Sequence, residues 1–541
     1  MTIRIDRRSF MVTGSIGIGA FAIPGFAQTP NVSDARGFTH SIASGEPTAD
    51  SVLLWTRYVP MTGESARLTA EISETADFAR VISGGAQITG NWRDFTSKIT
   101  VAGLKPGTRY YFRFVAPDGS FSPVGRTKTL PVGAARSFKV AIFSCSNLPF
   151  GYFNAYAHAA ARDDFDLAVH LGDYYYEYQP GVYPPAKDIV GGRTPQPISE
   201  IVQLADYRLR LASYRSDPDL QKLHSLVPMI VQWDDHESTN DSWEGGAQNH
   251  QKNEGEWSTR RAAAMQAYRE WMPISDEPWK AYSIGTLATL FRTETRLIGR
   301  TKPHELAPLL FSADPAKALV DFRNGSWQDP ASSMMGSQQE DWLAHAMRAS
   351  VQSGTKWQVV GFGTIMGKTM TPLSAESWVG PDADPRAKAY MRAGIAATKA
   401  GLPFNLDAWD GYPAARSRFL KSAQGMGANL VVLSGDSHNA WAYDLGQDGK
   451  AAGVEFAGQG VTSPGFESAL GVDPKIVAKA LVDTNPELKW CDTSRRGYMA
   501  LTITPTKVSN DWIFVDTIKT PSVAATVGHT ATVMRGRNVM G

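Results

Sequence analysis

Residues 167–177 read LAVHLGDYYYE, in which an apolar run passes directly into glycine, an acidic residue, three tyrosines and a second acidic residue. Three other segments have the same form: FKVAIFSCSN (138–147), PMIVQWDDHESTND (228–241) and LVVLSGDSHNAW (430–441). Short apolar runs of this length indicate strands buried on both faces. Because ligands of open α/β sheets collect at the carboxyl ends of strands, the four polar clusters predict one functional site.

Helical patterns alternate with these strands, which predicts a layered α/β domain over residues 137–520. We expect a helix over 152–162 and a further buried strand over 357–361. Residues 174–193 are rich in Tyr, Pro and Gly and are interpreted as a long ordered loop. The last residues, 521–541, are interpreted as a weakly specified C-terminal tail.

The chain ahead of this domain has strand character instead. The run VLLWTR (52–57) and the alternating segment RYYFRFV (109–115) indicate strands, and KPG (105–107) and PDG (117–119) indicate turns. The phrase around these turns resembles a corner of fibronectin type III-like domains. The sequence therefore predicts a small β-sandwich over residues 38–131.

Composition excludes several classes of protein. The chain has 541 residues with 54 Lys and Arg against 53 Asp and Glu, a net charge of +1. A protein that tracks a polyanion would carry a basic excess, so we expect no stable nucleic-acid complex. Two cysteines, Cys145 and Cys491, exclude a disulfide-stapled scaffold but leave one disulfide possible.

The first 28 residues have the features of a targeting segment. Arg7 and Arg8 precede a Gly- and Ala-rich apolar run, and small residues follow up to Ala27. This order predicts a signal peptide (1–28) recognised by the twin-arginine export machinery, hence a periplasmic or secreted protein. The alternative is an N-terminal helix with a chance Arg pair. No run reaches the ~20 apolar residues of a membrane span, so we expect no transmembrane segment in the mature chain.

The polar clusters contain metal-binding side chains. The Asp173 carboxylate can bridge two cations, and Tyr176 can return to the same point as a phenolate, a ligand suited to a hard trivalent metal such as Fe³⁺. Residues 234–237 gather three carboxylates and an imidazole in one turn, which is costly without cations. Asp436 and His438 add another pair, and Cys145 could add a soft thiolate. The sequence predicts a metal site.

Each cluster alone has a simpler interpretation. A single Asp or His at a strand end is commonly a helix cap, and Cys145 alone would be a small core residue or a disulfide partner of Cys491. Arg260 and Arg261 follow the third cluster, but most arginines of this kind lie on solvated helix faces.

The motifs also resemble a known family. The step Asp173-x-x-Tyr176 after Gly172 is similar to that of purple acid phosphatases and other calcineurin-like metallophosphoesterases. Where most of those have Gly-Asn-His-Asp/Glu and Gly-His-x-His, this chain has WDDHE (233–237) and GDSH (435–438). These departures resemble the PhoD-type alkaline phosphatase D family. The resemblance implies a β-sandwich catalytic core flanked by helices, preceded by the smaller sandwich.

The resemblance implies an iron(III) ion with calcium beside it. The residues that match iron ligands are Cys145, Asp173, Tyr176 and Asp436, and Asp173 matches the carboxylate shared with Ca²⁺.

It also implies roles for the other polar residues. Asp235 takes the position of a metal-binding asparagine, and Asn240 is expected to be a further ligand or a phosphate contact. His438 matches the last metal-binding histidine, and His236 matches a residue that contacts substrate or delivers a proton. Asp234, Glu237 and Asn439 would orient these ligands.

The functional hypothesis is an exported, metal-dependent alkaline phosphatase or phosphodiesterase. It would hydrolyse small phosphate mono- and diesters for phosphate acquisition, by attack of a metal-bound hydroxide, with Asp235, His236 and His438 in the catalytic group. Two alternatives stay open: a phosphodiesterase directed at phospholipids or nucleic-acid fragments, and a non-catalytic envelope-binding protein with a structural metal.

Overall fold

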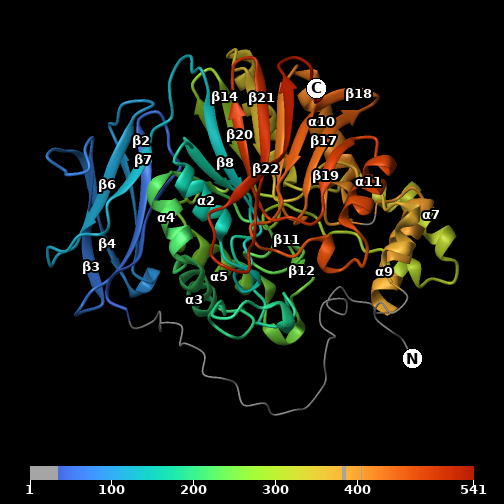
Figure 1. Ribbon diagram of the computed structural model, residues 1–541, viewed down its shortest axis with the longest axis horizontal. Coiled ribbons are helices and arrows are strands. Elements are labelled where there is room, and N and C mark those ends of the chain that lie inside the picture. Colours follow the sequence, from blue (N-terminus) through green and yellow to red (C-terminus); the bar gives the residue numbers. More distant parts are fainter. Residues whose placement is uncertain (1–34, 381–384, 404) are drawn as a thin grey trace, which may run out of the picture.

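The computed structural model describes residues 35–380, 385–403 and 405–541. The predicted signal peptide lies outside these residues and stays a prediction. Figure 1 shows a small sandwich (blue) at one end of the molecule, a larger layered body in the centre, and helices α7 and α9 at the other end. No helix in the described ranges is long and apolar enough to cross a bilayer.

The predicted N-terminal β-sandwich is confirmed. A four-stranded sheet in the order β4-β3-β6-β7 packs on strands β1, β2 and β5. Alternation explains the packing: in RYYFRFV the side chains of Tyr110, Phe112 and Phe114 are fully buried, whereas their neighbours face outward. The strands are β1 (Gly37–Gly45), β2 (Ser51–Val59), β3 (Ser65–Ser73), β4 (Val81–Gly90), β5 (Thr96–Ala102), β6 (Arg109–Val115) and β7 (Gly125–Lys128).

The central body contains two larger sheets. In the first, β22-β21-β20-β8-β9-β10 continue through β1 into β2 and β5, so the sandwich extends this sheet. Its strands are β8 (Phe138–Phe143), β9 (Leu167–His170), β10 (Met229–Val231), β20 (Gly497–Ile503), β21 (Lys507–Val515) and β22 (Ala525–Met534). The second has the order β13-β14-β15-β16-β18-β17-β19. Its strands are β13 (Lys280–Ile284), β14 (Ala288–Arg292), β15 (Trp357–Gly361), β16 (Leu430–Ser434), β17 (Ala440–Gln447), β18 (Lys450–Ala457) and β19 (Leu488–Asp492).

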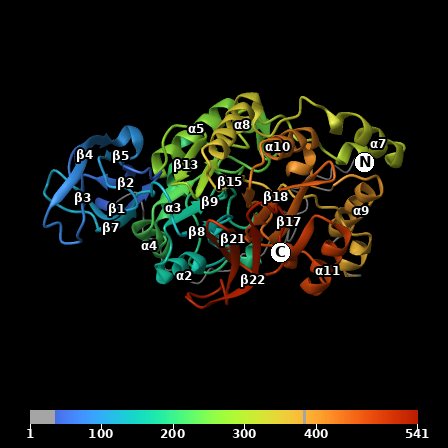
Figure 2. The same cartoon turned by 90° about the horizontal axis from the view of Figure 1, so that it is seen from above.

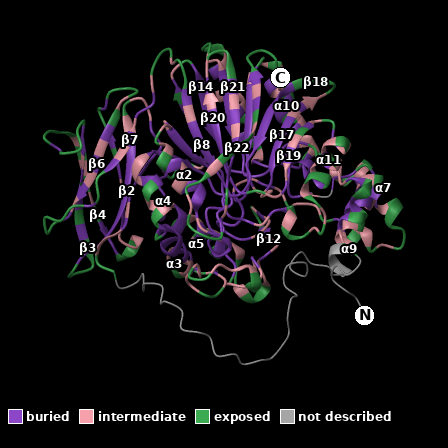
Figure 3. Cartoon of the chain, in the orientation of Figure 1, coloured by how far each residue is buried: buried purple, intermediate pink, exposed green. Residues whose placement is uncertain are grey.

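The two sheets pack face to face, and helices cover their outer faces. Val140 and Ile142 of β8 point into the core between the sheets, whereas Ala141 and Phe143 pack under the helices on the other side. Both faces are therefore buried, as Figure 3 shows in purple, which explains the uninterrupted apolar runs in the sequence.

The helices divide between the two outer faces and one end. Those over the first sheet are α2 (Asn154–Arg162), α3 (Leu204–Arg215), α4 (Pro218–Leu226) and α5 (Trp257–Trp271). Those over the second sheet are α8 (Gly336–Gln352), α10 (Pro413–Gly425) and α11 (Pro474–Thr484). The remaining helices are α6 (Ala307–Leu310), α7 (Pro315–Asn324) and α9 (Pro385–Lys399). A two-stranded hairpin, β11 (Ser242–Trp243) and β12 (Gly246–Ala247), lies before α5.

The prediction of a weakly specified C-terminal tail is wrong. Residues 525–534 form β22, which pairs along its length with β21 as the edge strand of the first sheet. Val533 is 1% exposed and His529 stacks on Trp490 at 4.2 Å between ring centroids. The sequence pattern is weak because β22 is an edge strand in which only Ala531 and Val533 are buried, so it shows little apolar alternation.

We expect a chain that ends at Pro521 to be less stable than the full chain. It would lose the main-chain hydrogen bonds of β22 and the burial of Val533, which alone contributes about 1.5–3 kcal/mol. Thermal unfolding of the two chains measures the difference. An unchanged melting temperature would show that the segment is a tail after all.

Candidate metal centre

The four predicted polar clusters meet at one place. Cys145 follows β8, Asp173 follows β9, Asp235 follows β10, and Asp436 and His438 follow β16. β16 belongs to the second sheet, so the centre lies where the carboxyl ends of strands from both sheets converge. The expected convergence of the four clusters at these strand ends is confirmed, whereas the function of the site stays a prediction.

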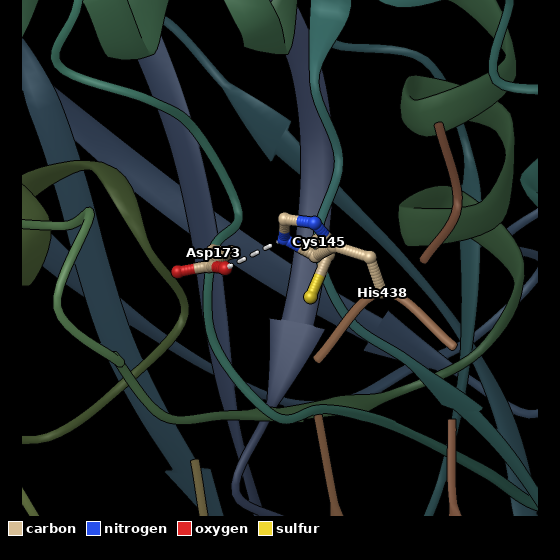
Figure 4. A group of neighbouring side chains, drawn as sticks. All are labelled: Cys145, Asp173 and His438. Atoms are coloured by element: carbon tan, nitrogen blue, oxygen red, sulfur yellow. Dashed lines mark ion pairs between the residues drawn. The ribbon is translucent and has the colours of Figure 1, made fainter. Parts of the chain in front are cut away.

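Asp173 is the residue that all the neighbouring groups share. Three sets of side chains have ligand atoms within 4.8 Å of one another: Cys145 with Asp173 and His438; Asp173 with Asp235 and His236; and Asp173 with Asp234, Asp235 and Asp436. Figure 4 shows the first set, in which His438 Nε2 lies 3.9 Å from Asp173 Oδ2. A carboxylate in this position can bridge two cations.

The backbone turns abruptly at these strand ends. Cys145, Asp173, Asp436 and His438 all adopt positive φ, from 54° to 62°, a conformation that non-glycine residues rarely adopt and that costs of order 1–3 kcal/mol each. Gly172 has φ +115°, and a Cβ there would lie 2.4 Å from Cβ of Asp234. The strain directs the side chains inward, a pattern typical of functional sites.

Tyr176 reaches the same point as Asp173. Its hydroxyl donates to Asp173 Oδ2 at 3.1 Å, and it lies 2.6 Å from Ser463 Oγ and 3.2 Å from His438 Nε2. The segment that carries it is the predicted ordered loop. Arg210, fully buried, secures that loop by donating to the main-chain carbonyls of Tyr176 and Tyr178.

The carboxylate oxygens of this centre are suited to bind cations. Asp173 Oδ1 and Asp235 Oδ1 are buried and have no hydrogen-bond partner among the described residues. Burial, followed by the charge of Asp234, raises the pKa of Asp436 to about 8, and burial likewise raises the pKa of Asp173. Buried carboxylates that resist ionisation and keep unused oxygens are the arrangement that a bound cation stabilises.

His438 is held in a neutral form that suits a ligand. Its Nδ1 lies 2.8 Å from the carbonyl oxygen of Pro464, which leaves Nε2 directed at Tyr176 and Asp173. Burial lowers the pKa of His438 to about 3. A proton on Nδ1 therefore leaves the Nε2 lone pair facing the centre.

His236 is paired with a carboxylate. Its Nδ1 lies 2.7 Å from Glu177 Oε2. Burial opposes both charges, but the negative groups Asp235 and Glu177 raise the pKa of His236 well above its usual value. The pairing orients the ring, which also packs on Tyr176 at 4.3 Å between centroids. Glu177 is the last residue of the second motif, yet no role was predicted for it.

Arg296 is the main residue that sequence reasoning missed. It is fully buried, donates to both oxygens of Asp234 at 2.5 and 3.0 Å, and donates to Asp407 at 2.6 Å. Its Nη2 also lies 3.7 Å from Asp235 and 3.9 Å from Asp436. Arg296 follows β14, an apolar run that ends in a polar cluster as the other four do, so the same signal could have found it.

The hydrogen bonds of Asp234, Glu237 and Asn439 join the centre to the chain around it. Both Asp234 oxygens accept from Arg296, and the Glu237 carboxylate accepts from the main-chain N–H groups of Asp173, Tyr174 and Asp234. Asn439 accepts from the N–H of Phe466. The orienting roles expected of these residues agree with their hydrogen bonds.

The hydrogen bonds of Asn240 do not connect its side chain to Asp173 or to the ligand groups around Asp173. Its side-chain amide donates to Gln248 at 3.1 Å and its main-chain N–H donates to Glu177. Its role as ligand or phosphate contact stays a prediction.

The structure excludes a disulfide between the two cysteines and a solvated position for Arg260. Cys145 and Cys491 are both free thiols, so no disulfide joins them. Arg260 is buried, not solvated: it pairs with Glu200 and Glu254 and supports the packing of α5.

Replacing Arg296 by Gln should strongly destabilise the protein. Removing one partner of a buried ion pair costs about 3–5 kcal/mol. The change takes from Asp234 the guanidinium that donates to both of its oxygens, whereas Asp407 keeps its ion pair with Arg300 at 2.6 Å. Arg418→Gln is the matched control, because Arg418 pairs with Glu340 at the surface, where such pairs contribute about 0–1 kcal/mol. Chemical denaturation measures both. Equal losses in the two variants would contradict the role given to Arg296.

Comparison with known proteins identifies the family of this chain. The family model for PhoD-like phosphatase matches residues 140–512, and the model for its N-terminal domain matches residues 25–131. Alkaline phosphatase D of Bacillus subtilis (strain 168) is 31% identical over 548 residues, covering 96% of this chain and 84% of that protein. A solved structure described as that of PhoD has a TM-score of 0.76 at 28% identity, covering 96% and 93% of the two chains. The chain belongs to the PhoD-like phosphatase family and is a phosphoric ester hydrolase.

Proposed function

We propose that the protein is an exported, metal-dependent hydrolase of phosphate mono- and diesters, with Fe³⁺ and Ca²⁺ at the centre around Asp173. The observation that carries the proposal is the sharing of Asp173 by all three groups of potential ligands. A thiol, a phenol and further carboxylates all lie close to this carboxylate, and such a mixture of soft and hard ligands favours two chemically different cations.

The side chains divide between the two kinds of cation. Cys145 and Tyr176, with Asp173 and Asp436, form the set suited to iron(III), since thiolate and phenolate bind transition metals strongly. Oxygen ligands suit calcium, and Asp235 provides an unpartnered buried oxygen beside Asp173. His438 and Asn240 would complete the coordination.

Metals at this centre would polarise a phosphoryl oxygen and activate water for in-line attack. The chain itself contributes the proton. Glu177 accepts at Nδ1 of His236 and stabilises the imidazolium, which leaves Nε2 free to donate to a leaving alkoxide. Glu177 in turn accepts from Thr239, Asn249 and the N–H of Asn240, so it is held in place as a carboxylate.

Arg296 lowers the negative charge that the centre presents. Its positive charge lies within 4 Å of the carboxylates of Asp234, Asp235, Asp407 and Asp436, which keeps these groups together before metals bind. Export by the twin-arginine route and a role in phosphate acquisition belong to the same proposal. They rest on the N-terminal Arg pair and on the family, respectively.

Tyr176→Phe should abolish visible ligand-to-metal absorption of the purified protein and lower its iron content. The phenolate would be the chromophore and one of the iron ligands. Tyr152→Phe, a change of the same kind outside the centre, should leave both unchanged. Absorption spectra with metal analysis test this, and a coloured, iron-replete Tyr176→Phe protein would exclude Tyr176 as a ligand.

Chelation should remove hydrolysis of both p-nitrophenyl phosphate and bis-p-nitrophenyl phosphate at alkaline pH, and added calcium should restore it when iron is retained. Comparison of kcat/KM for the two esters then gives the monoester or diester preference. Hydrolysis of both that persists in the chelated, metal-free protein would contradict metal dependence.

A further inference from the structure

A cleft lined by cationic side chains lies between the N-terminal sandwich and helix α5. An open cleft of about 620 Å³ is bounded on one side by strands of the sandwich and on the other by α5. Figure 2 shows β5 on the side of the sandwich toward α5. The side chains that define its chemistry are Arg93, Lys98, Arg269, Glu270 and Asp276, and no residue of the metal centre lines it.

The acidic residues of this cleft do not neutralise its cations. Glu270 is already engaged, because Arg208 donates to both of its oxygens at 2.7 Å and Gln266 donates to it at 2.9 Å. Asp276 is 83% exposed at its side chain and lies 3.8 Å from Lys98 Nζ. The cleft therefore keeps a positive charge.

Two arginines line the cleft with their hydrogen-bond donors unused, although the guanidinium of Arg269 also lies over the ring of Trp233, 5.9 Å from its centroid. In the described part of the chain, neither Arg93 nor Arg269 makes a side-chain hydrogen bond or an ion pair, and Nε of Arg93 is buried with its donor unused. A guanidinium offers five N–H donors in a fixed fork that matches two oxygens of a tetrahedral oxyanion. An unused buried donor costs free energy unless a ligand or water accepts from it.

Lys98 is a third cationic residue that lines the cleft. Its Nζ donates to the carbonyl oxygen of Ile274 at 2.8 Å, and burial lowers its pKa to about 8. An anion in the cleft would offset the repulsion between Lys98 and the two arginines.

We propose that this cleft binds a phosphate-type oxyanion, with Arg93 from the sandwich and Arg269 from α5 holding it from opposite sides. Such a ligand would join the N-terminal sandwich to the catalytic body at a point separate from the metal centre. The proposal does not depend on the reaction catalysed at that centre.

Equilibrium dialysis of the holoenzyme against labelled inorganic phosphate tests the site. In the double variant Arg93→Gln with Arg269→Gln, binding at the cleft should weaken by at least about tenfold, since each charged hydrogen bond lost weakens binding by about that factor. The chain should then bind one phosphate fewer than the wild type in the same concentration range. Hydrolysis of p-nitrophenyl phosphate should be retained, because neither arginine contacts the metal centre.

The double variant Arg67→Gln with Arg348→Gln is the matched control, because it removes the same charge from exposed positions outside the cleft. It should bind phosphate as the wild type does. Equal stoichiometry and affinity in the cleft variant and the wild type, or equal losses in cleft and control variants, would overturn the proposal. Should the double variant not fold, Arg269→Gln alone gives the same comparison.

Phenylphosphonate, which has a P–C bond that cannot be hydrolysed as an ester, identifies the source of the oxyanion. Displacement of phosphate from the cleft by phenylphosphonate would indicate the phosphate group of a larger molecule. Binding of inorganic phosphate alone would indicate free phosphate. Both results support an oxyanion site, whereas binding of neither would contradict it.

Discussion

The structure depends on the confinement of several carboxylates where the two sheets meet. Asp173, Asp234, Asp235 and Asp436 project into one buried volume, and their mutual repulsion must be balanced by positive charge. Arg296 supplies part of that charge from the protein side, and Asp407 fixes the arginine. Asp173 and Asp235 each keep a buried oxygen with no hydrogen-bond partner among the described residues, and His236 lies beside both, with its pKa raised by the negative charge around it.

The architecture explains why the carboxylates can be held there. Strands buried on both faces give a rigid frame, and the chain leaves three of them, β8, β9 and β16, through turns at positive φ that direct the side chains inward. Arg210 fixes the loop of Tyr176, Glu237 fixes the turns of Asp173 and Asp234, and Pro464 fixes the ring of His438. Tyr176, Asp173 and His438 therefore each have a supporting contact of their own.

The sequence was sufficient for the layered α/β body, the front sandwich and the convergence of four motifs, because buried strands that end in polar clusters are a local signal. It failed where the signal was not local. Asp407 lies 111 residues from Arg296 in the chain and meets it only through packing of the second sheet, whereas Arg296 follows β14 and carries the same local signal as the four motifs. β22 was missed because an edge strand needs little apolar patterning, and Glu177 was passed over because its partner His236 lies 59 residues away.

The most direct test of the account is a crystal structure of the purified holoenzyme with anomalous diffraction measured on both sides of the iron absorption edge. The account predicts an iron peak at bonding distance from Cys145 Sγ, the Tyr176 hydroxyl oxygen and an Asp173 oxygen, with a calcium ion on the opposite side of Asp173. An Asp173 carboxylate with no metal beside it in an active enzyme, or iron bound elsewhere in the chain, would contradict it.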